Sequence, residues 1–589
     1  MTIPPPCDTL YRKKDTEEKR MTKVKDIVYK RYTIEEGKAA FTAFETAMKS
    51  AKSAEDILRA REAWLAEMRH YATAASLSNC RFTLNTRDEF YQAEMDYYDE
   101  KSPEFSELLT AYASLMLDTP FRPELEKKLN PRIFKSFEVQ RKAFSPLVTE
   151  ECKKENALTT EYSKFMSEMK FEYDGKELPL SVLRGYLSHA DRNVRRAAAE
   201  AVGKGLEKNA ETLDRIYDDL VKIRTDIAHK LGYRDFVELG YYRMGRIDYD
   251  REMVAHFREN VARDLVPAVK AIKDRVTKDL DLGQMMFYDN ETYTNGASPD
   301  PILDEKGIFA AAQKMYDDMS PVTGAFMREM QEAEAFDVES RDGKWGGGYC
   351  TEFADWKQPF ILANFNGTSS DLDVITHEFG HALAAHFVFE EGDQELNVGG
   401  METAECHSMS MEFFAEKYME MFCGDGADAY RLKHMLDSFC FIPYGVIVDE
   451  FQHVIYEHPE YTPEDRKRVY RDLEKKYRPY LSYAGIPYLE EGTRWQYQMH
   501  IYESPFYYID YCLAQTVAFG FFLKSRKDYK GAFADYLNFV RQGGQKAFPA
   551  LVEEAGIASP FKDGSLCDLA REVARIADEL FDKVEKAES

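Results

Sequence analysis

Two histidines four residues apart have the spacing in this chain that most plainly predicts chemistry. His377 and His381 enclose Glu378 in a His-Glu-x-x-His pattern. Residues four apart on an α-helix lie one turn apart on the same face, so both imidazoles could reach one metal ion. Glu378 directly follows the first histidine and could act as a base on a water beside that ion. The pattern therefore predicts a zinc site with its own general base.

The flanking residues predict the helix that this spacing requires. Ser370 and Asp373 have the spacing of a helix start, and Gly392 is a stop signal after a helix that runs to about Phe389. Gly380 inside that helix costs about 1 kcal/mol relative to alanine, and a small residue there predicts close approach by a neighbouring element. Apolar residues fall at helical spacing at Ile375, Ala382, Leu383 and Phe387. The alternative interpretation is a surface helix that carries two histidines by chance.

A catalytic zinc usually takes three protein ligands, and the next predicted helix supplies candidates for the third. This helix covers residues 401–421 and carries Glu402, Glu405, Glu412 and Glu416. Glu405 is the ligand candidate. Glu412 lies two turns further along the same face and could orient a ligating imidazole. We expect the other two glutamates on a solvated helix face.

Two further side chains near the motif are weaker ligand candidates. Cys406 could be a soft ligand, but it points to a different side of the helix from Glu405. His386 is five residues past His381 and rotates off the ligand face, so we expect an ordinary packed or surface histidine.

The composition excludes several classes of protein. The chain has 589 residues, of which 44% are hydrophobic and 31% charged, and is long enough for several domain-sized units. A formal net charge of -26 argues against a nucleic-acid partner, because a phosphate backbone would be repelled. No run of about eighteen apolar residues and no apolar N-terminal h-region occurs, so we expect no membrane span, no signal peptide and a cytoplasmic location. The nine cysteines form no Cys-x-x-Cys pair and are expected to be reduced thiols.

Helical periodicity dominates the rest of the chain, and strand signals are few. Ser53-x-x-Asp56 and Ser102-Pro103 each predict a helix start. A C-terminal core helix is predicted by the apolar stripe Leu569, Val573, Ile576, Leu580 and Val584. A hairpin is predicted at 171–178, a short strand at 360–366 and a loop at 292–301. We therefore expect a mostly α fold with a few short strands near the metal site.

Further blocks follow in order along the chain beside the His377 motif. They are Gly348-Tyr349-Cys350, Pro359-Phe360, Ala363-Asn364-Phe365-Asn366-Gly367, residues 405–413, Phe441-Ile442-Pro443-Tyr444, residues 449–453, and the block from His500 to Tyr511. On these blocks the chain resembles the oligoendopeptidase F branch of the thimet oligopeptidase family of zinc metallopeptidases. The resemblance covers roughly residues 345–515 and reaches more weakly upstream to about residue 170.

This resemblance implies a multi-helix, zincin-like oligopeptidase fold with a deep internal channel. Residues 1–205 would form an N-terminal helical region that makes one wall of the channel, and residues 206–589 would form the catalytic region. It also implies one zinc ion held by His377, His381 and Glu405, in agreement with the third ligand favoured above.

The resemblance also implies roles for residues that no local pattern singles out. His500, Tyr507 and Tyr511 match the family's transition-state donors, with Tyr508 as an alternative register. The strand around Ala363, Asn364 and Phe365 resembles the family's edge strand, which pairs with the backbone of the substrate.

The expected function is that of a zinc-dependent endopeptidase acting on short peptides. One alternative is a carboxypeptidase or dipeptidyl carboxypeptidase on the same scaffold, which would need a group that grips the free carboxylate of the substrate. A second alternative is a protein that binds peptides without cleaving them, although binding alone would not need Glu378. We expect short peptides as partners, no nucleic acid and no membrane, and the oligomeric state stays open.

Overall fold

The structure is a computed structural model that describes residues 21–294, 300–397 and 399–588. Residues 1–20, which include Cys7, lie outside these ranges. Residues 295–299 of the loop predicted at 292–301 also lie outside them. Helices dominate the described residues and the strands are few and short, which confirms the predicted fold class. Seven cysteines in the described ranges are free thiols: Cys80, Cys152, Cys350, Cys406, Cys440, Cys512 and Cys567.

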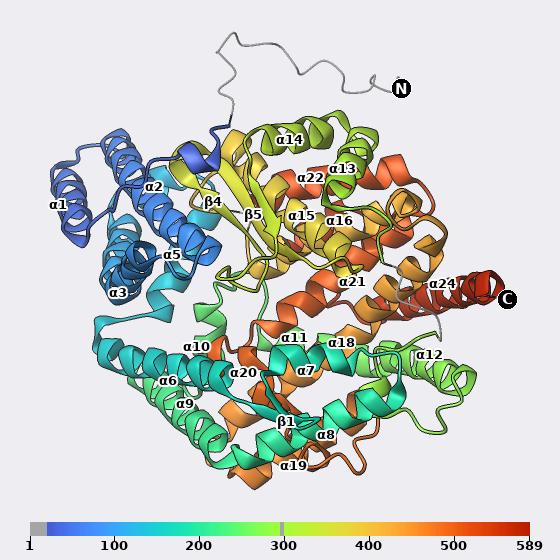
Figure 1. Ribbon diagram of the computed structural model, residues 1–589. Helices are drawn as coiled ribbons and strands as arrows, with labels where there is room; N and C mark the ends of the chain where they lie inside the picture. Colours follow the sequence, from blue (N-terminus) through green and yellow to red (C-terminus); the bar gives the residue numbers. More distant parts are fainter. Residues whose placement is uncertain (1–20, 295–299, 398, 589) are drawn as a thin grey trace.

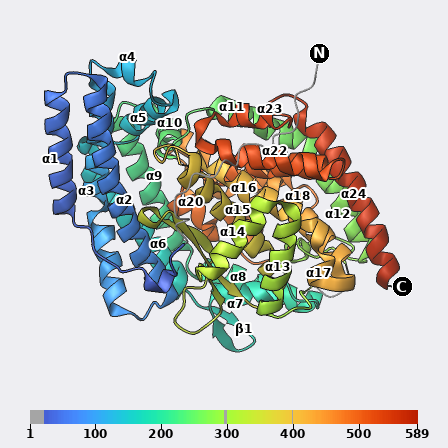
Figure 2. The ribbon, with the colours of Figure 1, turned by 90° about the horizontal axis from the view of Figure 1, so that it is seen from above.

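The first five helices form a lobe at one side of the molecule (Figures 1 and 2). They are α1 (Ile34–Ser50), α2 (Ala54–Leu84), α3 (Glu89–Asp118), α4 (Arg122–Leu125) and α5 (Pro131–Ala143). The lobe has an apolar cluster of its own, in which the Trp64 and Tyr112 rings stack at 5.6 Å. Ser53 caps α2 by accepting a hydrogen bond from the Asp56 amide, as predicted.

The predicted helix start at Ser102-Pro103 is wrong, because α3 continues through Pro103. Side chains on both sides of the proline are buried against α2. Phe105 stacks on Tyr71 with ring centroids 3.9 Å apart, and Tyr98 is packed nearby. Packing on both sides of the proline outweighs the loss of one backbone hydrogen bond.

The next part of the chain forms the lower tier in Figure 1. It comprises α6 (Thr149–Glu168), α7 (Leu180–Leu187), α8 (Arg192–Lys208), α9 (Ala210–Lys230), α10 (Phe236–Arg243), α11 (Arg251–Asn260) and α12 (Val266–Asp279). The predicted hairpin is present as β1 (Phe171–Tyr173) and β2 (Lys176–Leu178), which turn through Asp174 and Gly175 at positive φ. These helices share the main apolar core with the C-terminal half. Leu77 and Cys80 of α2 also belong to that core, whereas Leu396 packs in the core of the first lobe.

The C-terminal half begins with two helices and a small sheet. These are α13 (Glu305–Met319), α14 (Pro321–Glu332), β3 (Phe336–Glu339), β4 (Tyr349–Phe353) and β5 (Gln358–Phe365). In the sheet order β3-β5-β4, β5 is the central strand; it runs parallel to β3 and antiparallel to β4. The chain leaves β5 and enters α15 (Ser370–Glu391), which contacts both β4 and β5.

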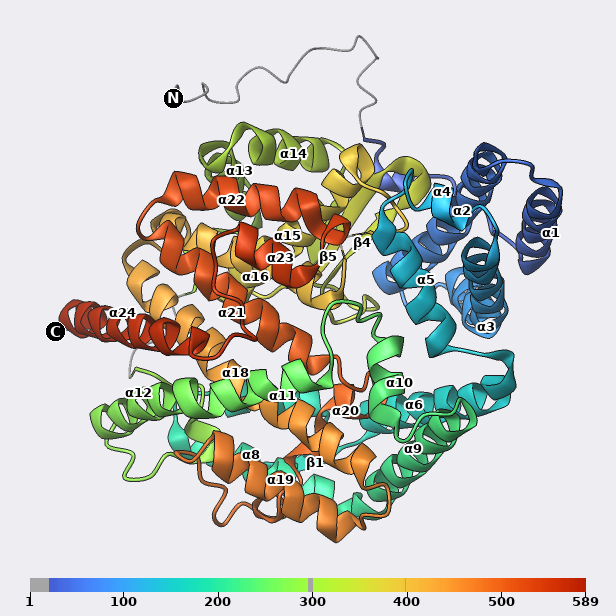
Figure 3. The same ribbon diagram turned by 180° about the vertical axis from the view of Figure 1, so that it is seen from behind.

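The remaining helices complete the C-terminal half. They are α16 (Met401–Ala415), α17 (Glu420–Cys423), α18 (Ala427–Glu457), α19 (Pro463–Tyr477), α20 (Met499–Glu503), α21 (Tyr508–Ser525), α22 (Tyr529–Gln542), α23 (Phe548–Glu554) and α24 (Ser565–Glu588). Helices α16 and α22 pack on α15, whereas α19 lies in the lower tier and α24 at the side (Figures 1 and 3). Helix α24 buries the predicted stripe from Leu569 to Val584. Among the residues described, no helix is both long and apolar enough to cross a bilayer.

Candidate active site

Helices α15 and α16 lie close together at Gly380, where the sequence predicts close approach by a neighbouring element. A Cβ atom at this position would lie 2.6 Å from the carbonyl oxygen of His407 and 2.6 Å from the Cα of Ser408. Backbone atoms at that distance leave no room for any side chain. The predicted bounds of α15 are confirmed, although Ser369 makes no side-chain cap and Asp373 instead accepts a hydrogen bond from Tyr430.

This close approach brings three predicted ligands together. The Nε2 atoms of His377 and His381 lie 3.4 and 3.7 Å from Glu405 Oε2, and one donor atom from each of the three residues lies within 4.8 Å of the others. The two histidine side chains are 25% and 22% exposed, whereas that of Glu405 is 6% exposed. The three side chains therefore converge on one point that solvent can reach.

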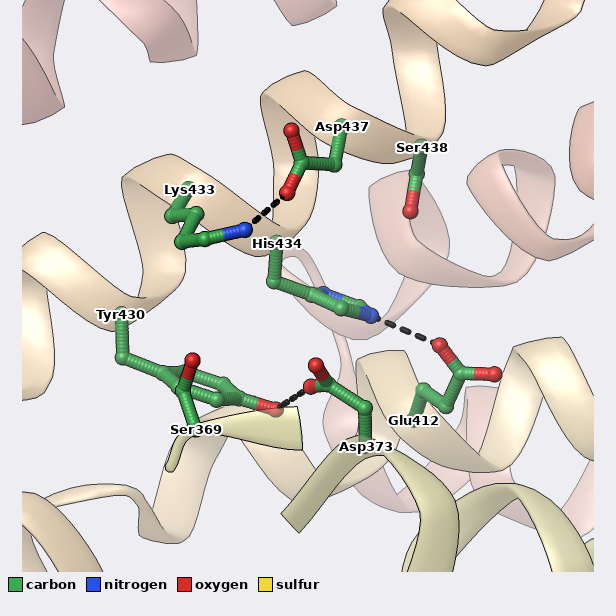
Figure 4. Close-up of a pocket in the computed structure, with 8 residues that line it drawn as sticks. All are labelled: Ser369, Asp373, Glu412, Tyr430, Lys433, His434, Asp437 and Ser438. Carbon is green, nitrogen blue, oxygen red and sulfur yellow. Dashed lines mark hydrogen bonds and ion pairs between the residues drawn. The ribbon is translucent and has the colours of Figure 1, made fainter. Parts of the chain in front are cut away.

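The partners of His377 extend into a chain of polar side chains behind the ligands. Its Nδ1 lies 2.6 Å from Glu412 Oε1, the contact predicted for Glu412. Glu412 Oε2 lies 2.8 Å from His434 Nε2, and His434 Nδ1 lies 2.9 Å from Glu416. Figure 4 shows the His434 ring pointing at Glu412, and both residues line a cavity together with Asp373. These contacts fix the His377 ring with its Nε2 towards Glu405.

Two predictions about α16 are wrong. The helix ends at Ala415 instead of near residue 421, and Glu402 and Glu416 are buried instead of solvated. Glu416 is drawn inward by His434, and Glu402 accepts a hydrogen bond from the buried Tyr249 hydroxyl. Sequence reasoning also missed His434, because it lies on α18 and no local pattern connects it to the motif.

The carboxyl groups of Glu378 and Glu405 have very different pKa values. Burial raises the pKa of Glu378 to about 7, although the charge of His377 opposes the shift. Burial alone would raise the pKa of Glu405, but the hydrogen bond from His377 and the charges of both histidines lower it to about 2. Burial lowers the pKa of His381 to about 4. Glu378 can therefore exchange a proton near neutral pH, whereas Glu405 stays ionised.

The donor set fits a zinc ion. Two imidazole nitrogens and one carboxylate are ligands that zinc prefers, and three protein ligands leave a position for water. The remaining nitrogen of His377 is held by a carboxylate, as is usual for metal-ligating histidines. The two weaker ligand candidates do not take part in this donor set. The Cys406 thiol contacts the Ala514 carbonyl, and the His386 ring packs on Phe326.

A second cluster, from α20 to the start of α21, faces the ligands. The Tyr507 hydroxyl donates a 3.1 Å hydrogen bond to Glu405 Oε1. The Tyr511 ring lies 4.8 Å from the Tyr507 ring, and the His500 ring lies 4.9 Å from that of Tyr508. The structure thus brings all three predicted donors to one place, and the Tyr507 hydroxyl contacts the candidate ligand Glu405.

The position of Tyr507 depends on an unusual turn at Phe506. This residue has φ of 68°, a left-handed conformation that bulky residues rarely adopt. Its amide donates to Gln452 Oε1 at 3.1 Å, and its carbonyl accepts from Arg246. Its ring is fully buried against Gly240, where a Cβ would lie 2.5 Å from the ring. Sequence reasoning missed these supporting residues, which lie far from Tyr507 along the chain.

The strand around residues 363–365, which the sequence predicts as an edge strand, is the end of β5, the central strand of the sheet. β4 pairs with β5 from Gln358 to Leu362, and β3 pairs with it as far as Phe365. The Ala363 carbonyl accepts from Lys344, and the Asn364 side chain donates to the Trp345 and Gly347 carbonyls. Their polar groups therefore hold the 344–347 turn in place.

Strand β4 occupies the edge position that was expected of residues 363–365. The Cys350 backbone lies near Glu378, since it opposes the rise in the pKa of that carboxyl. Within the described ranges no strand pairs with the other edge of β4.

The helical fold, the His-Glu-x-x-His helix and the His-His-Glu donor set together define a class of helical metallopeptidases. Models of the Peptidase M3 N-terminal domain and of Peptidase family M3 match residues 24–144 and 311–570. The chain belongs to peptidase family M3, and within it to the oligoendopeptidase F branch.

Three similar proteins place the chain in this family. Oligopeptidase PepF from Bacillus subtilis (strain 168) is 24% identical over 417 residues, which are 68% of this chain but only 60% of that protein. The solved structure of PZ peptidase A with inhibitor 2 is 40% identical, with a TM-score of 0.89 over 95% of this chain and 100% of that chain. A candidate oligoendopeptidase F from Bacillus anthracis str. Ames is 38% identical, with a TM-score of 0.84 over 95% and 98%.

Proposed function

We propose that this chain is a zinc-dependent endopeptidase that hydrolyses short peptides. The observation that carries the proposal is the convergence of His377, His381 and Glu405 on one solvent-accessible point, with Glu378 beside it. Membership of peptidase family M3 supports a metallopeptidase. A protein that only binds peptides would have no use for a carboxylate whose pKa is raised to about 7 by burial at this place.

Each side chain has a defined part in the proposed reaction. The chemistry that a bound zinc ion supplies is that of a Lewis acid, which polarises a carbonyl and lowers the pKa of water towards about 7. The Glu378 carboxylate takes the proton from the attacking water and passes it to the nitrogen of the leaving amine. Tyr507, Tyr511 and His500 donate hydrogen bonds to the oxyanion or to the peptide backbone.

We propose that the peptide adds as a strand along the free edge of β4. Pairing through the backbone would align the scissile bond beside Glu378 and give broad sequence preference. The substrate-binding role expected of Ala363, Asn364 and Phe365 then becomes indirect, through the turn that their polar groups hold. Tyr508 contributes its ring to the wall beside His500.

The proposed internal channel would restrict substrates to short peptides. It is supported by the high similarity to solved structures of the branch and by side chains that lie deep in the protein yet keep solvent-exposed surface, such as His377 and His381. We retain residues 1–205 as the proposed wall, although their helices divide between two apolar cores. A cytoplasmic location agrees with the free thiols, and the net charge of -26 disfavours nucleic acid and anionic membranes.

The decisive test is Glu378→Gln, which keeps the shape of the side chain but removes the base. We expect cleavage of an internally quenched peptide to fall by at least about 1,000-fold, while zinc content measured by mass spectrometry stays at one ion per chain. Glu390→Gln, on an exposed position of the same helix, is the matched control and should keep full activity. Retained cleavage by zinc-loaded Glu378→Gln would refute the role of Glu378.

The exopeptidase alternative needs a separate measurement. Mass spectrometry of the products from one peptide, with free and amidated C-termini, reads the cleavage position directly. Internal cleavage of the amidated peptide supports an endopeptidase. Removal of one or two residues from the free acid alone would instead favour the carboxypeptidase or dipeptidyl carboxypeptidase.

A further inference from the structure

An arginine deep in the protein, close to the donor cluster, lacks a carboxylate partner. Arg494 begins the short helical turn Arg494–Tyr497, just before α20. One terminal nitrogen donates to the Tyr444 hydroxyl, and its Cζ lies 4.1 Å from the centre of the Tyr444 ring and 5.3 Å from that of Tyr497. Its Nε is buried with no hydrogen-bond partner, and within the described ranges no carboxylate forms an ion pair with it.

A second arginine makes the local excess of positive charge clearer. The Cζ of Arg478 lies 4.9 Å from the same Tyr444 ring, but Arg478 is paired with Glu474. That carboxylate is already shared, since the Tyr483 hydroxyl also donates to it at 3.1 Å. Two guanidinium groups therefore contact one ring, and the one carboxylate nearby pairs with Arg478, so the unbalanced charge belongs to Arg494. A buried cation is costly unless an anion accompanies it.

The environment of Arg494 connects directly to the donor cluster. The Tyr444 hydroxyl donates to Gln498 Oε1, and Gln498 Nε2 lies 3.0 Å from His500 Nδ1. The rings of Tyr444 and Tyr508 lie 5.8 Å apart, and Tyr508 in turn contacts His500. Two side chains, Tyr444 and Gln498, thus connect Arg494 to His500. Arg494, Gln498 and His500 are each partly exposed. A bound peptide that passes His500 could reach it.

From these observations we infer that Arg494 binds a carboxylate of the peptide substrate, a few residues beyond the scissile bond. The inference rests on the proposed function and specifies the substrates of that site. A guanidinium can hold a carboxylate through two parallel hydrogen bonds, and the surrounding rings keep it in a fixed plane. The carboxylate can be the free C-terminus of the peptide or an acidic side chain. Peptides that place one there are bound more tightly, whereas peptides without one are still cleaved.

Three peptides that differ only at the C-terminus test this assignment. One ends in a free acid, one in a carboxamide, and one in a carboxamide with glutamate as its last residue, each prepared with two, three or four residues after the scissile bond. For at least one length we expect the wild-type protein to cleave the free acid with kcat/KM about 10- to 100-fold above the carboxamide, mainly through KM. If the glutamate peptide is cleaved as well as the free acid, any carboxylate at this position is sufficient. If it is cleaved less well than the free acid, Arg494 binds the free C-terminus specifically.

Variants of Arg494 then show whether this side chain is responsible. Arg494→Met should bring the ratio of kcat/KM for the carboxylate peptides to kcat/KM for the plain carboxamide close to one, while the carboxamide is still cleaved. Arg494→Lys should keep part of the advantage, because the charge remains while the paired hydrogen bonds are lost. The carboxamide also reports on folding, since a misfolded variant loses activity on all three peptides.

Two results would overturn the inference. One is wild-type protein that cleaves the acid and the carboxamide equally well at every length, which needs no variant to fold. The other is a correctly folded Arg494→Met variant that keeps the preference. Cleavage of the carboxamide in either case leaves the proposed function intact, whereas absence of chelator-sensitive cleavage of any peptide would overturn both proposals.

Discussion

The two halves of the candidate site are built in different ways. The proposed metal-binding region consists of α15 and α16, two consecutive helices that pack directly on each other at Gly380. The proposed donor region, residues 500–511, depends on elements far away in the sequence. Gln452 of α18 and Arg246 form hydrogen bonds with the backbone of Phe506, and Gly240 of α10 leaves room for its ring. The first region is held together locally, and the second by contacts between parts of the chain that lie far apart in the sequence.

This difference predicts that the two regions can be damaged separately. Displacement of α15 from α16 moves the ligands themselves, so it should reduce metal affinity. Displacement of the turn at Phe506 moves Tyr507 while His377 and His381 stay where they are, so it should reduce kcat at full metal content.

Loss of the third ligand should have the largest effect. Glu405→Ala removes the carboxylate that lies within 3.7 Å of both imidazoles. We expect zinc affinity, measured by competition with a fluorescent chelator, to fall by more than about 100-fold, and cleavage to fall with it. The matched control is Glu402→Gln, one turn earlier on the same helix. Glu402 is equally buried, and its pKa is raised to about 7, so glutamine resembles its protonated form.

An equally large fall in zinc affinity for Glu402→Gln and Glu405→Ala would contradict this prediction. It would mean that any change to a buried glutamate of α16 weakens zinc binding. The distinction between ligand and neighbour on α16 would then be lost. Full zinc occupancy in Glu405→Ala would exclude Glu405 as a ligand outright.

The metal-binding region could be predicted from the sequence because its geometry is local. The spacing of His377 and His381, the helix start near Ser370 and the small residue at Gly380 all describe one helix and its nearest neighbour. Glu405 followed because α16 is the next helix along the chain. His434 was missed because its contact with Glu412 joins α18 to α16, and a helix pattern carries no information about such a pairing.

The donor region and the sheet could be predicted only in part. The family resemblance supplied Tyr507, but the turn at Phe506 and its support by Arg246 depend on packing over long distances in the sequence. The edge position was assigned to β5 instead of β4, because strand order is set by pairing and not by the composition of either strand.

Removal of one donor should reduce the rate without removing the metal. Tyr507→Phe deletes the hydroxyl that donates to Glu405 at 3.1 Å. We expect kcat for a quenched peptide to fall by about 100-fold with zinc content unchanged, as for the loss of one oxyanion donor. Tyr508→Phe is the control, because the described contacts of Tyr508 with His500 and Tyr444 are made by its ring. A larger loss for Tyr508→Phe would reverse the register and place Tyr508 on the reacting atoms.

Changes at the two glycines should have smaller and separable effects. Gly380→Ala puts a methyl group 2.6 Å from the backbone of α16, and backbone cannot move aside as a side chain can. We expect the melting temperature to fall, with a stability loss of about 1–3 kcal/mol, and zinc affinity to fall about tenfold. Gly185→Ala, in the exposed helix α7 with nothing within 4 Å, is the control and should stabilise or change nothing. Unchanged zinc affinity in a folded Gly380→Ala would show that the ligand geometry tolerates a wider helix spacing.

Gly240→Ala is the corresponding change for the donor region, and it should have the smallest effect. Its methyl group would lie 2.5 Å from the Phe506 ring, which can shift slightly because it is a side chain, although Tyr241 and His453 pack on it. A shift of Phe506 displaces Tyr507 relative to Glu405, so we expect kcat to fall about 3- to 10-fold. Zinc affinity should equal that of the wild type, the opposite of the result for Gly380→Ala. If both alanine variants lose zinc to the same extent, the two regions form one cooperative unit, and the local packing of α15 on α16 is insufficient to hold the ligands.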